Sequence, residues 1–261
     1  MLSDINPLYA LSGFFVGMIV GFTGVGGGSL MTPLLVLVFG IHPSTAVGTD
    51  LLYAAVTKSV GASIHGFSRN IAWPVVGRLA AGSVPMTIAT LITLNFYGLH
   101  SDKAAATITF VLGIALLCTS VSLVFRKQIV AFAARHAGPE NPARTASMTV
   151  ATGAALGLLV SLSSVGAGAL GVTALIILYP RMPTVRIVGT DIAHAVPLTL
   201  IAGIGHWWLG SVDFGMLGNL LIGSIPGIAV GSWLAPKLPD HILRPMLATI
   251  LVIVGLRLVL A

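Results

Sequence analysis

Residues 21–30 read GFTGVGGGSL, a cluster of glycines inside an apolar stretch that runs from about residue 8 to residue 40. One straight helix of that length would measure about 50 Å, which is more than a bilayer can accommodate. The glycines therefore predict a break, at which the stretch forms either a re-entrant hairpin or two short spans. In both cases the chain returns to the side of the membrane from which it entered.

The composition of the whole chain is that of a membrane protein. Of its 261 residues 56% are hydrophobic and only 8% are charged, a balance that would force a water-soluble domain to expose large apolar patches. The net charge of +6 could suggest nucleic acid, but the basic residues are scattered between apolar segments and form no continuous face. The single cysteine, Cys118, excludes disulfides and multi-cysteine metal sites within one chain. We expect a multi-pass protein of the cell inner membrane without cofactor, metal or nucleic acid.

Proline, glycine and charged residues divide the chain into eight apolar blocks. Helices are the default for each block, because a backbone in lipid must satisfy its own hydrogen bonds. The predicted fold class is therefore all-α and integral to the membrane. The blocks lie at about residues 8–40, 43–64, 73–96, 104–125, 147–179, 184–206, 213–235 and 242–260.

The two halves of the chain resemble each other. In the second half, about 140 residues on, GMIVGFTGVGGGSL is matched by GLLVSLSSVGAGAL, VGTDLLYA by VGTDIAHA, and GRLAAGSVP by GNLLIGSIP. Matching motifs in successive blocks indicate a duplicated unit of four blocks, which is typical of secondary transporters. We expect a first repeat at residues 1–125, a basic cytoplasmic linker at 126–146 and a second repeat at 147–261.

The basic residues indicate how this unit is oriented. If the first and fifth blocks turn back, only Lys103 and Arg257 lie on one side, and the other side has the pattern that the positive-inside rule requires. The basic residues on that other side are Arg69, Arg126, Lys127, Arg135, Arg144, Arg181, Arg186, Lys237 and Arg244. Both termini are then external. Each half makes an odd number of full crossings, so the two repeats are inverted relative to each other. Inverted repeats place a binding site near the midplane, at their interface.

The two glycine clusters are candidates for a substrate-binding site. Each precedes the second half of a broken block and would present unpaired amides and a positive dipole end at the midplane. Such a helix start attracts an anion without the cost of a buried lysine. A simpler role, in which glycine lets helices touch, is expected for Gly13, Gly17, Gly21, Gly153 and Gly157. The candidate binding residues are Gly26, Gly27, Gly28, Ser29, Gly166, Ala167 and Gly168.

Two carboxylates, Asp50 and Asp191, lie inside apolar blocks, where an ionised carboxylate costs on the order of 3 kcal/mol. Both should therefore face the protein interior. At a spacing of three residues, Asp50 shares a helix face with Tyr53, and Asp191 shares one with His194. Two roles stay open for the acids: proton carriers of a transport cycle, or structural anchors that hold the broken segments.

Three further polar residues belong to the candidate site. Thr49 and Thr190 precede the acids, and their hydroxyls could bond to a ligand or to backbone. Lys58 lies in a block of the first repeat and is matched by Thr199 in the second. This asymmetry suggests a function in coupling or gating; the alternative is a side chain that snorkels to the membrane surface.

The chain resembles a known family over nearly its whole length. The stretches that resemble the sulfite exporter TauE/SafE family, also called the toluene sulfonate uptake permease family, are GFTGVGGGSLMTPLL, VGTDLLYAAVTKSVGASIHG, WPVVGRLAAGSVP, VGTDIAHAVPLTLIAGIGHWWLG and LLIGSIPGIAVGSWLA. The resemblance implies a carrier of sulfite, thiosulfate or an organosulfonate, driven by the proton gradient. One departure is the second glycine motif, which has Ala167 and lacks the proline found at Pro33 in the first. The two broken helices need not contribute equally to the site.

We therefore expect a secondary transporter of a small anion that works by alternating access. An enzyme is not expected, because the chain shows neither a nucleophile spaced with a base nor a P-loop. The alternatives are an anion channel, an importer of another small organic anion, and a structural membrane subunit. The small-residue faces would also suit a homo-oligomer.

Overall fold

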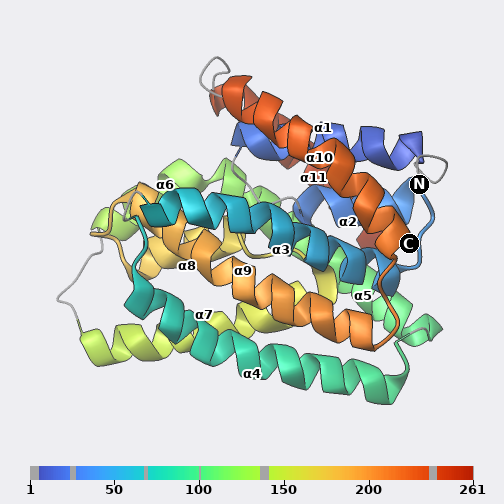
Figure 1. The fold of residues 1–261 in the computed structure, drawn as a ribbon. Helices are drawn as coiled ribbons and strands as arrows, with labels where there is room; N and C mark the ends of the chain where they lie inside the picture. Colours follow the sequence, from blue (N-terminus) through green and yellow to red (C-terminus); the bar gives the residue numbers. More distant parts are fainter. Residues whose placement is uncertain are drawn as a thin grey trace.

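The helices of the protein follow the apolar blocks closely. The computed structural model describes residues 6–23, 28–67, 70–99, 101–135, 141–234 and 240–260. These residues contain helices and no strand (Figure 1). The helices are α1 (Pro7–Thr23), α2 (Gly28–Leu37), α3 (Pro43–Phe67), α4 (Trp73–Tyr97), α5 (Asp102–Val124), α6 (Arg126–Arg135), α7 (Pro142–Ser163), α8 (Ala169–Leu178), α9 (Thr184–Trp208), α10 (Phe214–Leu234) and α11 (Asp240–Leu260).

The first and fifth apolar blocks are each divided into a long helix and a short one. The 17 residues of α1 are followed by the 10 residues of α2, and the 22 residues of α7 by the 10 residues of α8. A helix of that shorter length measures about 15 Å, half the thickness of the hydrocarbon core. The predicted breaks are present, and α2 and α8 are too short to cross a bilayer.

Both short helices turn back along the long helix that precedes them. The hydroxyl of Tyr179, which follows α8, lies 2.8 Å from Thr149 Oγ1 in the N-terminal half of α7. In the first half, the ring of Phe39 follows α2 and lies 4.8 Å from the ring of Tyr9 in the first turn of α1. Each broken segment therefore ends close to where it began, as a hairpin does.

The long helices pack in pairs that join the two halves of the chain. Helix α1 packs along α10 and α4 packs along α7, while α3 pairs with α9 and α5 pairs with α11 (Figure 1). In the sequence repeat, α1 corresponds to α7, α3 to α9, α4 to α10 and α5 to α11. If each helix is replaced by its repeat equivalent, the pair α1 with α10 becomes the pair α7 with α4. The pairs α3 with α9 and α5 with α11 stay the same. The duplication of sequence is therefore also a duplication of packing.

Glycines let two of these pairs touch backbone to backbone. Gly153 of α7 lies against the Leu79 carbonyl of α4, so that an added Cβ would overlap the oxygen. Its repeat equivalent, Gly13 of α1, lies in the same way against the Leu220 carbonyl of α10. The packing role predicted for these glycines is confirmed, because no larger residue would allow so close an approach. The equivalent contacts one turn later are made by Gly17 and Gly157.

The substitution Gly153→Ala should destabilise the protein, because its methyl group would overlap the Leu79 carbonyl oxygen. Overpacking of this kind typically costs about 1–3 kcal/mol. The substitution Gly77→Ala, on the facing helix α4, is the matched control, since nothing lies within 4 Å of its Cβ position. Thermal unfolding in one detergent compares the two variants. Equal stability would contradict the close packing of α4 on α7.

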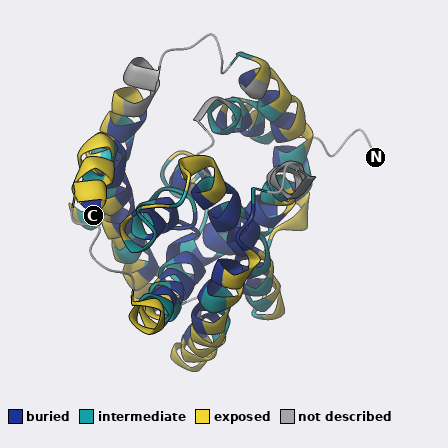
Figure 2. Cartoon of the chain, turned by 90° about the vertical axis from the view of Figure 1, so that its left-hand side faces the viewer, coloured by how far each residue is buried: buried dark blue, intermediate teal, exposed yellow. Residues whose placement is uncertain are grey.

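The outer surface suits a membrane. Five stretches of the described residues are long and apolar enough to cross one: α4, α5, α7, α9 and Phe214–Gly231 of α10. Figure 2 shows buried residues on the inward sides of the helices and exposed residues around the outside. Four exposed tryptophans lie at or near helix ends, where an interfacial aromatic belt would place them: Trp73, Trp207, Trp208 and Trp233.

The segment between the two halves contains a helix that the sequence did not predict. Residues Arg126–Arg135 form α6, within what we expected to be a hydrophilic linker. Ile129 and Ala133 of α6 join the apolar cluster that contains Leu175 and Ile176 of α8. The linker therefore packs against the end of the second hairpin.

Candidate functional site

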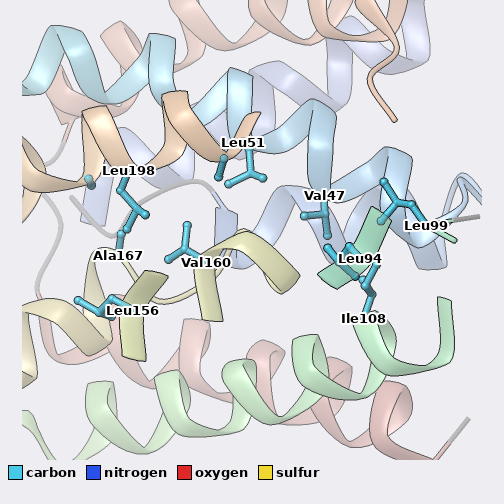
Figure 3. Packing of buried hydrophobic residues seen from close by; sticks show 11 residues of the cluster. Val47, Leu51, Leu94, Leu99, Ile108, Leu156, Val160, Ala167 and Leu198 are labelled. Carbon is cyan, nitrogen blue, oxygen red and sulfur yellow. The ribbon is translucent and has the colours of Figure 1, made fainter. Parts of the chain in front are cut away.

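The second break, at residues 164–168, is held by apolar packing on several sides. Figure 3 shows Ala167 of the break near Leu198 of α9 and Leu156 of α7, with Leu51 of α3 in the same cluster. Gly166 and Gly168 have φ angles of 131° and 126°, which residues with a Cβ rarely adopt. The glycines predicted from the motif are therefore required by the backbone of the break itself.

Helix α8 starts without a capping side chain. Its N-cap is Gly168, which makes no side-chain cap hydrogen bond. The amide of Gly171 in the first turn bonds to the Gly166 carbonyl oxygen at 3.0 Å. The amides between these two positions lie at the positive end of the helix dipole. The second glycine motif thus lies at a helix start, while its role in anion binding stays a prediction.

Only the end of the first break belongs to the described residues. Gly26 and Gly27 lie outside them, Gly28 is the first residue of α2, and Ser29 is buried in the first turn of that helix. The site is therefore described around the second break.

Lys58 of α3 reaches the second break. Its Nζ donates a hydrogen bond to the Ala167 carbonyl oxygen at 3.0 Å, and the side chain is partly buried. The equivalent residue of α9, Thr199, instead donates to the carbonyl oxygen of Ala195 in its own helix at 2.8 Å. Lys58 thus points into the protein, and it gives the second break a cation through a contact that its repeat equivalent does not make.

Asp191 of α9 lies over the first turn of α8. Its side chain is buried, and a Cβ added at Gly171 would overlap its Oδ1. The carboxylate interacts with the Gly168 amide and with the charge of Lys58. Within the described part of the chain, however, no hydrogen bond of ordinary geometry reaches either carboxylate oxygen. A carboxylate of the protein itself therefore stands at the amides that we expected to attract an external anion.

Asp50 of α3 has the corresponding position in the first half, with a better partner. It is buried, and the hydroxyl of Thr32 in α2 donates a hydrogen bond to its Oδ2. The repeat equivalent of Thr32 is Val172, which has no hydroxyl to offer Asp191. Both acids are buried, as expected, and each connects a central helix to a short broken helix. Asp191 is the less satisfied of the two.

Tyr53 and His194 make equivalent hydrogen bonds to the outer helix pairs. The Tyr53 hydroxyl lies 2.5 Å from Ser224 Oγ in α10, and His194 Nε2 lies 2.9 Å from Ser83 Oγ in α4. His194 is buried and its Nδ1 has no hydrogen-bond partner among the described residues. These two bonds tie the central helices α3 and α9 to α10 and α4.

The hydroxyls of Thr49 and Thr190 are bonded to backbone. Thr49 accepts a hydrogen bond from the Asp213 amide at 3.1 Å, and Thr190 accepts one from the Ala72 amide at 2.9 Å. Asp213 and Ala72 directly precede α10 and α4. The sequence analysis considered a ligand or the backbone as partner of these hydroxyls. In the structure each hydroxyl bonds to a backbone amide at the start of a neighbouring helix.

The comparison with protein families agrees with this architecture. The family model described as sulfite exporter TauE/SafE matches residues 9–258. The chain belongs to the sulfite exporter TauE/SafE family. As a member it is a multi-pass membrane transporter.

Curated relatives cover the TauE/SafE protein almost from end to end. The probable membrane transporter protein YjnA of Bacillus subtilis is 39% identical over 254 residues, which are 95% of this chain and 98% of the relative. A second Bacillus subtilis relative, the probable membrane transporter protein YdhB, is 28% identical over 94% of this chain and 96% of its own. A probable membrane transporter protein of Methanocaldococcus jannaschii is 26% identical over 97% of this chain and 95% of its own. No solved structure matches the chain significantly.

The structure of this TauE/SafE protein brings only part of the predicted site together. The predicted residues that meet at the second break are Asp50, Lys58, Gly166, Ala167, Gly168 and Asp191. Two residues that the sequence analysis did not select also belong here: Thr32, which bonds to Asp50, and Ser164, at the C-terminal end of α7. A signal for Ser164 existed, because it replaces the repeat equivalent Gly24.

Proposed function

We propose that this TauE/SafE protein is a secondary transporter of a small anion, of the sulfite, thiosulfate or organosulfonate class, that couples anion movement to protons by alternating access. The observation that carries the proposal is the position of Lys58. Its ammonium group bonds to the Ala167 carbonyl at the second break and lies within the electrostatic reach of Asp50 and Asp191. One amino group and two carboxyl groups, which could carry protons, thereby lie close together inside a membrane protein.

An anion is supported as substrate by the two kinds of positive group at the break. The Lys58 ammonium can offer a charge-assisted hydrogen bond, and its present acceptor is only a neutral carbonyl oxygen. The start of α8, whose N-cap residue is a glycine, adds a positive dipole end. A small oxyanion has several acceptor oxygens and no donor when ionised, so it suits both groups together.

Proton coupling follows from the position of Asp191. Its carboxylate lies at the same helix start that would receive the substrate. A negatively charged substrate beside an ionised Asp191 would be repelled strongly in the low-dielectric interior of the protein. A proton bound to Asp191 removes this competition and lets the anion take the place beside Gly168 and Lys58. Anion and proton then move together, and the two gradients determine the direction of net flux.

The duplicated packing supports alternating access. The helix pairs α1 with α10 and α4 with α7 exchange when the two halves are exchanged. If the repeats are inverted in the membrane, the same exchange converts a site open on one side into a site open on the other. We propose this inverted arrangement for a protein of the cell inner membrane. Both termini are then external, and the basic segment between the halves lies in the cytoplasm.

Flux measurements in proteoliposomes test the proposal. The substrate panel is sulfite, thiosulfate, sulfoacetate, taurine, sulfate and acetate, each with and without an imposed pH gradient. We expect saturable uptake of at least one sulfur oxyanion or sulfonate, increased when the outside is acidic. Protein-free vesicles correct for sulfite that crosses as its neutral acid. Flux that does not saturate would indicate a channel, and absence of protein-dependent flux for the whole panel would contradict the proposal.

A further inference from the structure

Ser164 has a backbone conformation that is unfavourable for serine. It is the C-cap of α7, with φ 58° and ψ 0° in the left-handed region. Among the described residues it is the only non-glycine residue with positive φ. Glycine adopts this conformation freely, and the first repeat has a glycine, Gly24, at the equivalent position. A serine at a position where glycine would fit better points to a use for its hydroxyl.

The Ser164 hydroxyl is buried and lacks an ordinary hydrogen bond. The residue is 3% exposed, and its Oγ has no partner of ordinary geometry in the described part of the chain. The Asp50 carboxylate interacts with this hydroxyl, yet Asp50 Oδ1 is also without an ordinary hydrogen bond there. Buried polar atoms are almost always bonded in folded proteins. The contact between Ser164 and Asp50 falls short of an ordinary hydrogen bond, so the hydroxyl can turn to another acceptor that comes within reach.

Two hydrogen-bond donors thus lie at the second break, one from the break itself and one from α3. The Ser164 hydroxyl is at the start of the break, and the Lys58 ammonium is held at the Ala167 carbonyl, three residues later. A hydroxyl and an ammonium group together match a ligand with at least two acceptor oxygens on one centre. Asp50 competes strongly for the hydroxyl when it is ionised and more weakly when it carries a proton, because a neutral carboxyl oxygen is the poorer acceptor.

We propose that Ser164 is a substrate-positioning residue, whose hydroxyl donates a hydrogen bond to one oxygen of the transported oxyanion while Lys58 binds the anion's charge. The inference rests on the proposed anion transport and assigns the oxyanion contact to the second repeat. The first repeat cannot make the same contact, because Gly24 has no side chain. The protein therefore has one asymmetric substrate site in spite of its duplicated fold.

The substitution Ser164→Gly separates this role from a structural one. Glycine relieves the left-handed strain, so the thermal unfolding temperature should stay the same or rise. Loss of a hydrogen bond to a charged ligand should at the same time raise KM for the transported anion about tenfold or more. Ser164→Ala should raise KM to the same extent without the gain in stability. Ser161→Ala is the matched control with unchanged KM, since the buried Ser161 hydroxyl bonds to the Gly157 carbonyl of its own helix at 2.7 Å.

The measurement uses reconstituted protein and labelled thiosulfate or sulfite, whichever the wild-type protein carries. A rise in KM for both Ser164 variants, with stability kept in the glycine variant, supports the inference. An unchanged KM in Ser164→Gly would overturn it and leave Ser164 with a structural role. Failure of the wild-type protein to carry any oxyanion would instead overturn the proposed function, so the two failures are distinguishable.

Discussion

The substitution Lys58→Met should abolish saturable anion transport while leaving the protein folded. Methionine is similar in length to lysine but removes the ammonium group that bonds at the second break. Loss of a charge-assisted hydrogen bond worth about 3 kcal/mol lowers anion affinity about 100-fold. The effect is increased by Asp50 and Asp191, which would no longer be balanced by the positive charge of Lys58. Flux per reconstituted protein, measured over a range of external anion concentrations that includes the wild-type KM, measures the loss.

Two further variants show whether charge or shape is responsible. Lys58→Arg keeps a cation and should retain part of the flux, with a raised KM because its planar head differs from an ammonium group. Lys58→Thr introduces the residue found at the equivalent position, Thr199, and should be as inactive as the methionine variant. Size-exclusion chromatography and thermal unfolding verify that all three are folded. If Lys58→Met kept the wild-type KM and maximal transport rate, Lys58 would not be part of the binding site.

The substitution Asp191→Asn should separate anion movement from proton movement. The amide is close in shape to a protonated carboxyl group, so the variant should still exchange anion for anion across the vesicle membrane. It should no longer respond to a pH gradient, because it has no proton to release. A gradient of one pH unit is worth about 1.4 kcal/mol per coupled proton, or about tenfold in anion accumulation. That factor should disappear in the variant.

Asp50→Asn provides the contrast. Asp50 accepts a hydrogen bond from Thr32 and so anchors α2, whereas neither oxygen of Asp191 has an ordinary hydrogen bond among the described residues. Asp50→Asn should therefore lower the thermal stability more than Asp191→Asn does. Retained pH-gradient stimulation in Asp191→Asn would show that Asp191 is not the proton carrier. A protein that no longer exchanges anions at all would favour the structural role for this residue.

The architecture was largely predictable because it depends on local and repeated features. The glycine clusters near residues 26 and 166 indicated the two breaks, and the structure divides both segments there. The four-residue spacing of Gly13 and Gly17, repeated at Gly153 and Gly157, indicated close helix contacts that the structure confirms. Chain length in a bilayer and the size of glycine decide such features, and both can be read without knowing which helices are neighbours.

The details of the site depended on contacts that no local pattern encodes. Lys58 and Ala167 are far apart in sequence, and nothing in either motif showed that the lysine would bond to the second break rather than the first. The position of Asp191 over α8 depends on the missing side chain at Gly171, where the first repeat has Met31. The left-handed Ser164 was visible only as a difference between repeats. Comparing the two halves for differences, rather than for similarities, would have identified Gly171 and Ser164 as unusual positions.

The most direct test of the account is to follow protons while an anion gradient alone drives transport. Vesicles loaded with a pH-sensitive dye, at equal pH inside and outside, receive an inward gradient of a transported anion that has no membrane-permeant acid form, such as thiosulfate. The account predicts that the interior acidifies as the anion enters, with wild-type protein and not with Asp191→Asn. Anion entry with an unchanged internal pH in the wild-type protein would contradict it.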